Sequence, residues 1–201
     1  MLYLLKSMTF KKLTIIYKQY LVFSSANYRT DETDLETGNW HPATLAIVGG
    51  KPFNLFVDPS IDGLVTIKDG KPQISNQKEM NEAQVISFVD SSIDNGNTVF
   101  QSSLLVFKGK NLVPANASRP SLDNRRVLAT FQDGSYGIIQ INKHLKLDEL
   151  SDFLSKIPGI ENAVNLDTGG GNLGGFADKN GHYQLFNDTA DYEQAALFYI
   201  K

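Results

Sequence analysis

The stretch AVNLDTGGGNLGG, residues 163–175, carries the most structural and chemical information in this chain of 201 residues. Residues 163–166 are mostly small or apolar and have the length of a buried strand, which ends at Asp167. The glycines that follow have no side chains, so a ligand can approach backbone N–H groups in the loop. A rigid strand that aims a carboxylate into such a loop predicts a site for an anionic or oxygen-rich ligand. A tight turn that needs positive φ angles explains the same residues equally well.

The glycine-rich loop differs from the common phosphate-binding loops. The chain has no G-x-x-x-x-G-K-[ST] motif, and no G-x-G-x-x-G motif opens a helix, so both nucleotide-binding folds are excluded. It also has no G-x-S-x-G motif, which argues against a serine hydrolase.

Upstream of the loop, residues 147–157 have the apolar periodicity of a helix. Their apolar side chains recur with helical spacing and share one face: Leu147, Leu150, Phe153, Leu154 and Ile157. Asp148 and Glu149 occupy the first turn, where the helix dipole favours acidic residues, and Pro158-Gly159 ends the helix.

Two Asp-Gly pairs predict hairpins. Asp133-Gly134 joins the apolar runs at 126–131 and 135–141, and Asp69-Gly70 follows the run at 64–67. An Asp-Gly pair between apolar runs is typical of a tight hairpin turn, because glycine tolerates the positive φ that such turns require.

Strands dominate the rest of the chain, with a polar loop expected over residues 25–42. The fold class that follows is α+β: a curved, mixed or mostly antiparallel sheet with one main helix packed on it. Residues 1–43 supply N-terminal strands and the loop, and residues 44–201 form the main part of a single globular unit. The other predicted strands cover residues 12–17, 20–24, 44–48, 53–57, 85–89, 98–107, 183–186 and 195–200.

Composition excludes several partners and cofactors. A net charge of −3 gives no electrostatic basis for binding nucleic acid. The chain has no cysteine, and His41, His144 and His182 lack zinc-ligand spacing, so no metal and no cofactor is predicted. Lysines interrupt the apolar residues 1–23, so we expect neither a transmembrane segment nor a clear signal peptide. Localisation and oligomeric state stay open.

Residues 165–172 (NLDTGGGN) resemble the N-L-D-G-G-G-S-S signature of the phosphodiester glycosidase family. The resemblance extends to residues 124–129 (NRRVLA) and the following Asp133-Gly134, which are similar to the family's arginine-bearing strand and turn. Residues 46–54 (AIVGGKPFN) resemble an upstream A-I-N-G-G-F-F segment more weakly. The resemblance implies a phosphodiester glycosidase-like domain over residues 44–201, in a family that is usually exported or part of the cell envelope.

The resemblance implies cleavage of a sugar from a glycosyl phosphodiester. Such cleavage needs a cation to hold the phosphate and a carboxylate to stabilise the positive charge on the sugar ring. Arg126 suits the first role, because a guanidinium grips phosphate oxygens bidentately, and Asp167 suits the second. Arg125 competes with Arg126, and strand alternation places the two on opposite faces. A surface salt bridge is the structural alternative for Arg126.

The sugar-phosphate or glycan ligand would contact the loop and two upstream segments. The predicted substrate-binding residues are Thr168, Gly169, Gly170, Gly171, Asn172, Gly49, Gly50 and Trp40, the last as a stacking face for a sugar ring. A second catalytic carboxylate is left open among Asp58, Asp62, Asp133 and Glu161.

Some positions depart from the family pattern. Thr168 stands where the family has glycine, Gly171 and Asn172 stand where it has serines, and Val48 stands where it has asparagine. A buried polar ligand loses contacts when such donors are replaced. Two alternatives to a hydrolase therefore stay open: a non-catalytic glycan- or phosphosugar-binding protein, and a structural protein in which the glycine loop is only a connection.

Overall fold

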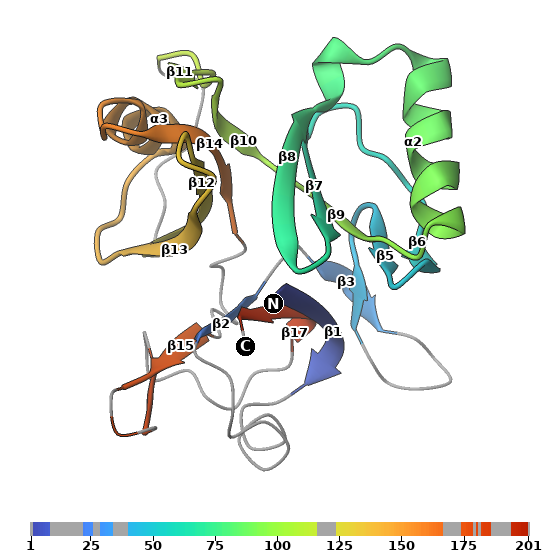
Figure 1. Cartoon of the computed structure of the whole chain (residues 1–201), viewed down its shortest axis with the longest axis horizontal. Coiled ribbons are helices and arrows are strands. Elements are labelled where there is room, and N and C mark those ends of the chain that lie inside the picture. The colour runs from blue at the N-terminus through green and yellow to red at the C-terminus, as the bar shows by residue number, and fades with distance from the viewer. Residues whose placement is uncertain are drawn as a thin grey trace.

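The computed structural model describes residues 2–8, 22–25, 29–33, 40–115, 124–166, 174–178, 180, 182–185 and 194–200. These residues form three five-stranded sheets, one two-stranded ribbon and two α-helices, and all paired strands are antiparallel (Figure 1). The predicted α+β class with mostly antiparallel pairing is therefore confirmed. The expectation of one sheet with one main helix is wrong, because the chain divides its strands among several sheets.

The first sheet, called sheet I, carries Arg126. Its strands are all antiparallel, and the predicted hairpin over residues 126–141 forms one of its edges. The end of the strand that precedes the glycine loop lies in the middle of this sheet, as the sequence predicts for a buried strand. In order, sheet I contains β11 (Lys110–Asn111), β10 (Leu104–Phe107), β14 (Ile160–Asn165), β12 (Arg125–Phe131) and β13 (Tyr136–Ile141).

The second sheet, called sheet II, is built from the upstream part of the chain. Its strand β9 (Thr98–Ser102) is followed along the chain by Ser103 and then by β10 of sheet I, so the two sheets are joined at Ser103. The predicted single strand over residues 98–107 is thus divided in two at this residue. In order, sheet II contains β6 (Lys51–Asn54), β5 (Ala46–Val48), β9 (Thr98–Ser102), β7 (Gly63–Lys68) and β8 (Lys71–Asn76).

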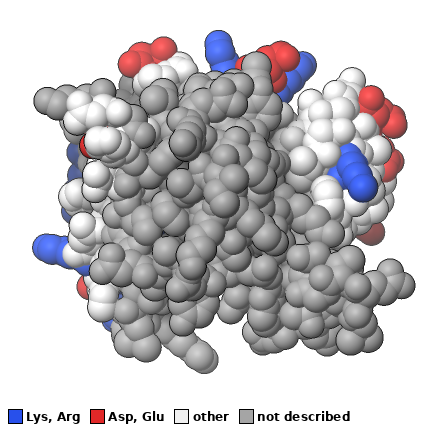
Figure 2. Space-filling view, turned by 90° about the horizontal axis from the view of Figure 1, so that it is seen from below, with Lys and Arg blue, Asp and Glu red and all other residues white. Residues whose placement is uncertain are grey.

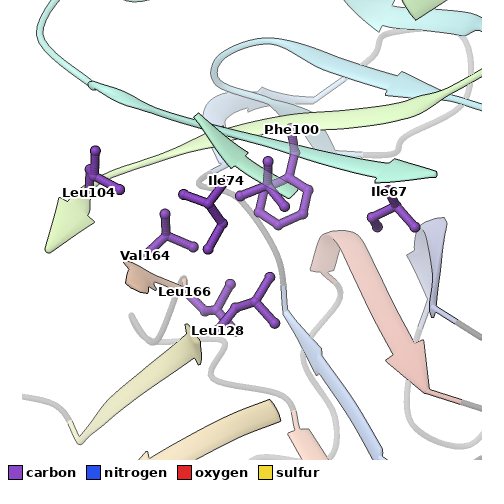
Figure 3. Packing of buried hydrophobic residues seen from close by; sticks show 8 residues of the cluster. Ile67, Ile74, Phe100, Leu104, Leu128, Val164 and Leu166 are labelled. Carbon is purple, nitrogen blue, oxygen red and sulfur yellow. The ribbon is translucent and has the colours of Figure 1, made fainter. Parts of the chain in front are cut away.

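The main core lies between sheets I and II. Side chains from both sheets meet there, because alternate residues of each strand point to the same face (Figure 3). Leu128, Val164 and Leu166 approach from sheet I and its end, and Ile74 and Phe100 approach from sheet II. The two sheets therefore form a sandwich whose inner faces are mostly apolar.

One helix covers the outer face of each sheet. Helix α3 (Leu147–Ser155) packs Leu150 and Leu154 against sheet I, as predicted, whereas Phe153 of the predicted apolar face is 49% exposed. Helix α2 (Glu82–Asp94) packs partly buried apolar side chains against sheet II. The order of layers is α2, sheet II, sheet I and α3. Neither α-helix of the described residues is long and apolar enough to cross a membrane.

Strands from both ends of the chain form the third sheet, called the terminal sheet. It lies below sheets I and II in the view of Figure 1. Strand β15 follows the glycine-rich loop and pairs with β2, so the loop connects sheet I to the terminal sheet. In order, the terminal sheet contains β1 (Leu2–Met8), β17 (Gln194–Ile200), β2 (Val22–Ser25), β15 (Gly174–Ala177) and β16 (Tyr183–Leu185).

The predicted hairpin turns are confirmed. Asp69 and Gly70 have φ angles of 51° and 74°, which is the type I′ geometry expected between β7 and β8. Between β12 and β13, Gly134 has a φ of 82° and donates its N–H to the Phe131 carbonyl at 2.9 Å. Glycine is needed at both positions because side chains disfavour positive φ.

The prediction of a strand over residues 85–89 is wrong, because these residues lie within α2. The run VISFV contains β-branched and aromatic residues that favour strands. A capping box outweighs that preference: the Asn81 side chain accepts from the Gln84 N–H at 2.9 Å, and the Gln84 side chain accepts from the Asn81 N–H at 2.8 Å.

The long loop predicted over residues 25–42 is also wrong in part. It contains β3 (Arg29–Thr33) and β4 (Trp40–Pro42), which pair with each other as an antiparallel ribbon. Their sequences, RTDET and WHP, are polar or contain proline and so give little indication of strand structure. The strand predicted over residues 12–17 lies outside the described residues.

Candidate active site

Arg126 lies at the start of β12 and faces the space between the two sheets. Strand alternation places it on the same face as Leu128, whereas Val127 points toward α3. The Arg126 side chain is 0% exposed, and it is the largest fully buried side chain among the described residues. Its burial excludes the surface salt bridge that the sequence leaves open. A buried guanidinium requires polar partners, since an uncompensated buried charge is costly.

Gln140 supplies one of these partners. The Arg126 Nε–H donates to the Gln140 Oε1 at 2.9 Å, and the two residues are paired across β12 and β13. The Gln140 amide in turn donates from Nε2 to the Asn142 Oδ1 at 3.1 Å. The guanidinium is therefore anchored to its neighbouring strand by a neutral carboxamide.

Gly174 lies against the face of the same guanidinium. A Cβ atom built on Gly174 would lie 2.5 Å from Arg126 Nη1, 2.6 Å from Cζ and 2.9 Å from Nη2. These distances are far shorter than van der Waals contact, so any larger residue at position 174 must displace the guanidinium. The glycine that begins β15 is thus required by the position of Arg126.

Both ends of the glycine-rich loop therefore contact Arg126. On the near side, the Leu166 N–H donates to the Arg126 carbonyl at 2.9 Å. On the far side, Gly174 packs on the Arg126 guanidinium. The predicted site residues between them, Asp167, Thr168, Gly169, Gly170, Gly171 and Asn172, lie outside the described residues.

The strand end that leads into the loop is firmly held. The Asn165 N–H donates to the Ser103 carbonyl at 2.9 Å, and the Asn165 carbonyl accepts a short hydrogen bond from the Ser102 hydroxyl. Asn165 itself is buried, and its Nδ2 donates to the Leu166 carbonyl at 3.1 Å. Asn165 and Leu166 are thus buried at the end of this strand, as the sequence predicts for a buried strand before the loop.

Arg125 lies on the opposite side of β12, which confirms the predicted alternation. Its Nε–H donates to the Leu145 carbonyl at 2.7 Å, just before α3. Arg125 is therefore directed away from the space between the sheets, where Arg126 lies.

Gly49 and Gly50 form the tight turn between β5 and β6 in sheet II, with φ angles of 57° and 79°. The Gly50 N–H donates to the Asn97 carbonyl at 2.9 Å, and a Cβ at Gly50 would lie 2.6 Å from the Ile93 carbonyl oxygen. These contacts place the turn against the end of α2. Trp40 lies in β4, and its side chain is outside the described residues.

Three of the four candidate second carboxylates are held in local interactions. Asp58 accepts from the Ser60 N–H and hydroxyl, and Asp62 pairs with Lys78 at 3.0 Å and accepts from the Leu104 N–H. The hydroxyl and then the N–H of Ser135 donate to Asp133 and lower the pKa of that carboxyl. These bonds account for the orientation of each carboxylate without a ligand.

Asp133 and the fourth candidate, Glu161, lie at the wrong end of their strands. Asp133 is in the turn after β12, whereas Arg126 is near the start of that strand, so about 17 Å of extended chain separates Arg126 from the turn. Glu161 lies near the start of β14, opposite the end of β12. Paired carboxylates in sugar hydrolases lie within about 10 Å of each other. The loop that carries Asp167 follows the end of β14, whereas Glu161 and Asp133 lie at the start of that strand, about 17 Å of extended chain away, which argues against both residues as its partner.

Surface charge gives no general attraction for an anionic ligand. Figure 2 shows the molecule from below; among the described residues on this face, Lys and Arg are interspersed with Asp and Glu. The net charge of the chain is −3. Recognition of an anion would therefore depend on local groups rather than on the overall field.

The chain belongs to the phosphodiester glycosidase family, whose model matches residues 23–195. This match begins in β2, upstream of the resemblance at residue 44. Among solved structures, the chain is similar to the catalytic domain of zebrafish N-acetylglucosamine-1-phosphodiester alpha-N-acetylglucosaminidase, auto-inhibited by its pro-peptide. The TM-score is 0.67 at 14% identity, and the match covers 99% of this chain and 72% of the zebrafish chain. A search of curated proteins found no match.

Two residues of the candidate site were not predicted from the sequence. Gln140 could have been found by counting outward from the predicted turn, because Gln140 and Arg126 are equally far from Asp133 along the chain. The sequence around Gly174 does not predict its contact with Arg126, because that contact depends on where β15 of the terminal sheet lies relative to sheet I.

Proposed function

We propose that this chain is a hydrolase that cleaves a sugar from a glycosyl phosphodiester, with Arg126 as the phosphate clamp and Asp167 as the key carboxylate. The observation that supports this proposal most strongly is the contact of Arg126 with both ends of the loop that carries Asp167. Family membership and the shared fold give independent support.

In the proposed reaction, the bond between the anomeric carbon and the phosphate oxygen breaks, and its electrons leave with the phosphate. Water supplies a hydroxyl group to the sugar and a proton to the phosphate monoester. The Asp167 carboxylate stabilises or traps the oxocarbenium-like centre, and Arg126 stabilises the departing phosphate. Phosphate is a good leaving group, so this reaction needs less general-acid assistance than the release of an alkoxide.

The other residues predicted to bind substrate complete the proposal. Thr168, Asn172 and the backbone of the three glycines between them would bind phosphate or sugar oxygens. Gly49, Gly50 and Trp40 stay proposed contacts for the sugar. The zebrafish relative is named for an N-acetylglucosamine 1-phosphodiester, so such a diester is the first substrate to test on this chain.

A second candidate is a protein that binds a phosphosugar without cleaving it. Two observations favour it: the serines of the family signature are replaced by Gly171 and Asn172, and Arg126 is completely buried. A phosphate can reach a buried guanidinium only if the neighbouring residues move. Both candidates predict binding of a phosphosugar, but only the hydrolase predicts its turnover.

Turnover of an N-acetylglucosamine 1-phosphodiester by wild type and by Asp167→Asn tests the proposal. We expect release of free sugar by wild type and a loss of at least about a hundredfold in the variant, with an unchanged far-UV spectrum and melting temperature. Asp133→Asn is the matched control, because it removes the same charge at the far turn and should retain activity. Full activity of Asp167→Asn would refute the catalytic assignment, and binding by wild type without turnover would establish the second candidate.

A further inference from the structure

A groove lies between helix α2 and the outer face of sheet II, on the side of this sheet away from Arg126 (Figure 1). We call it the α2 groove; its volume is about 670 Å³, within the range of roughly 300–1,000 Å³ that is typical of sites for small molecules. Hydroxyl and carboxamide side chains from β7, β8, α2 and the segment after α2 line it: Thr66, Gln73, Ser75, Ser87, Ser91 and Asn97. The groove is therefore polar, although it lies beside the apolar contacts that hold α2 on the sheet.

The polar side chains of the α2 groove have unused hydrogen-bonding capacity. Within the described chain, none of these six hydroxyl and carboxamide groups forms a hydrogen bond to another residue. Lys68 is the one charged side chain among the described residues that line the groove. Hydroxyl and carboxamide groups both donate and accept hydrogen bonds, which matches the hydroxyl groups of a sugar. The groove thus offers many neutral polar groups and little charge.

Thr66 is the buried member of this set. It is 8% exposed and lies on the same face of β7 as Leu64, which packs against α2. Its register partner in β8 is Gln73, so the two side chains leave the sheet side by side on the face of the groove. A buried hydroxyl without a partner costs free energy, and a hydroxyl that borders a groove gains a partner when a polar ligand binds there. Thr66 therefore indicates a ligand that carries hydrogen-bonding groups.

We propose that the α2 groove binds a neutral glycan chain, with the Thr66 hydroxyl and the Gln73 carboxamide bonded to sugar hydroxyl groups. Phe88 also lines the groove and is half-buried, so it supplies an apolar surface for the C–H face of a sugar ring. An anionic ligand needs more cations than Lys68, and an apolar ligand would leave the polar groups unpaired. Because the groove and Arg126 lie on opposite sides of sheet II, glycan binding here is independent of the proposed hydrolase activity.

An NMR titration of the full ¹⁵N-labelled chain with three neutral trisaccharides, chitotriose, maltotriose and cellotriose, tests this proposal. We expect at least one of them to bind with a dissociation constant of about 1 mM or below, and to shift the amide signals of Thr66, Gln73 and Ser87. Absence of binding by all three at concentrations up to about 10 mM would overturn the proposal. Binding that leaves the signals of β7, β8 and α2 unchanged would also overturn it.

Thr66→Val removes the hydroxyl and keeps the shape of the side chain. We expect the dissociation constant of the bound trisaccharide to rise about tenfold, while the melting temperature stays the same or rises because a buried unpaired hydroxyl is lost. Thr44→Val is the matched control: the Thr44 hydroxyl is also buried without a partner, but it does not line the α2 groove. The control should keep the dissociation constant within about twofold of wild type. Equal affinities of the two variants would contradict the proposal.

Gln73→Ala gives a second readout that does not depend on the folding of Thr66→Val, because Gln73 is exposed on β8. We expect a roughly fivefold rise in the dissociation constant. Gln132→Ala is its matched control, since Gln132 is exposed in the turn after β12 and lies outside the groove, and it should bind as wild type does. Wild-type affinity in Gln73→Ala would contradict the assigned contact.

Asp167→Asn separates glycan binding in the α2 groove from the proposed hydrolase function. We expect this variant to bind the trisaccharide with the affinity of wild type, whether or not it has lost turnover. If the hydrolase assignment fails, the titrations of Thr66→Val and Gln73→Ala still decide the proposal for the groove. Loss of trisaccharide binding in a folded Asp167→Asn variant would place the ligand at the signature loop and overturn that proposal.

Discussion

The guanidinium of Arg126 and the Cα of Gly174 lie in direct contact, although one residue is in sheet I and the other begins β15 of the terminal sheet. The Leu166 N–H holds the backbone of the same arginine. The loop that carries the family signature is therefore held at both ends by one residue.

Gly174→Ala should destabilise the chain and weaken any activity that depends on Arg126. The added methyl would lie 2.5 Å from Nη1, so the guanidinium must move, and overpacking of this kind costs about 1–3 kcal/mol of unfolding free energy. Gly137→Ala on β13 is the matched control, since no atom lies within 4 Å of its added methyl and its φ is not positive. Urea denaturation of both variants checks the prediction; equal unfolding free energies would show that the contact is not rigid.

Gly49 and Gly50 should respond differently to alanine. Both have positive φ, which costs an alanine about 1–2 kcal/mol. At Gly49 the methyl meets no atom within 4 Å, whereas at Gly50 it would lie 2.6 Å from the Ile93 carbonyl oxygen. We expect Gly50→Ala to lose about 1–3 kcal/mol more stability than Gly49→Ala. A loss of activity in Gly49→Ala that exceeds its loss of stability would instead support the proposed contact of this turn with substrate.

Ser135→Ala should raise the pKa of Asp133 toward its ordinary value. The Ser135 hydroxyl and N–H lower this pKa in the folded chain, and only the N–H remains in the variant. A carboxyl with a lowered folded pKa contributes stability above its unfolded pKa and loses that contribution as the pH falls through the folded pKa. The variant should therefore lose less stability on acidification. NMR titration of the Asp133 carboxyl carbon measures the shift, and an unchanged pKa would contradict the assigned cause.

Asn81→Ala should destabilise α2 by about 1 kcal/mol, because it removes the side-chain acceptor of the capping box. Asn81→Asp is the conservative variant and should retain most of the stability, since aspartate caps helices about as well as asparagine. Helix content by circular dichroism and urea denaturation provide the measurements. Equal stability of the two variants would show that the cap contributes nothing measurable.

The hairpin and helix around the site were predictable because their determinants are local. Asp133-Gly134 specifies the turn, and the alternation of residues 126–131 then places Arg126 and Arg125 on opposite faces. The apolar spacing of residues 147–157 likewise predicts α3, although the helix ends at Ser155. In each case the pattern, the turn and the packing agree.

The helix α2 and the contact between Arg126 and Gly174 were not predicted, for different physical reasons. In α2, the β-branched and aromatic run at 85–89 favours a strand, and the four-residue capping box from Asn81 to Gln84 favours the helix that forms. At the site, the contact between Arg126 and Gly174 joins residues of two different sheets. Local propensity and periodicity describe single elements and therefore do not predict how two sheets lie relative to each other. Strands as polar as β3 and β4 are specified by their pairing rather than by composition.

The most direct test of the central claim is the turnover of an N-acetylglucosamine 1-phosphodiester by Arg126→Lys, which keeps the charge and removes the planar fork. With a fold confirmed by its melting curve, we expect kcat/KM at least about a hundredfold below wild type, because a lysine cannot hold two phosphate oxygens side by side. Wild-type kcat/KM in this folded variant would contradict the account, since the arginine that closes the signature loop would then play no part in the reaction.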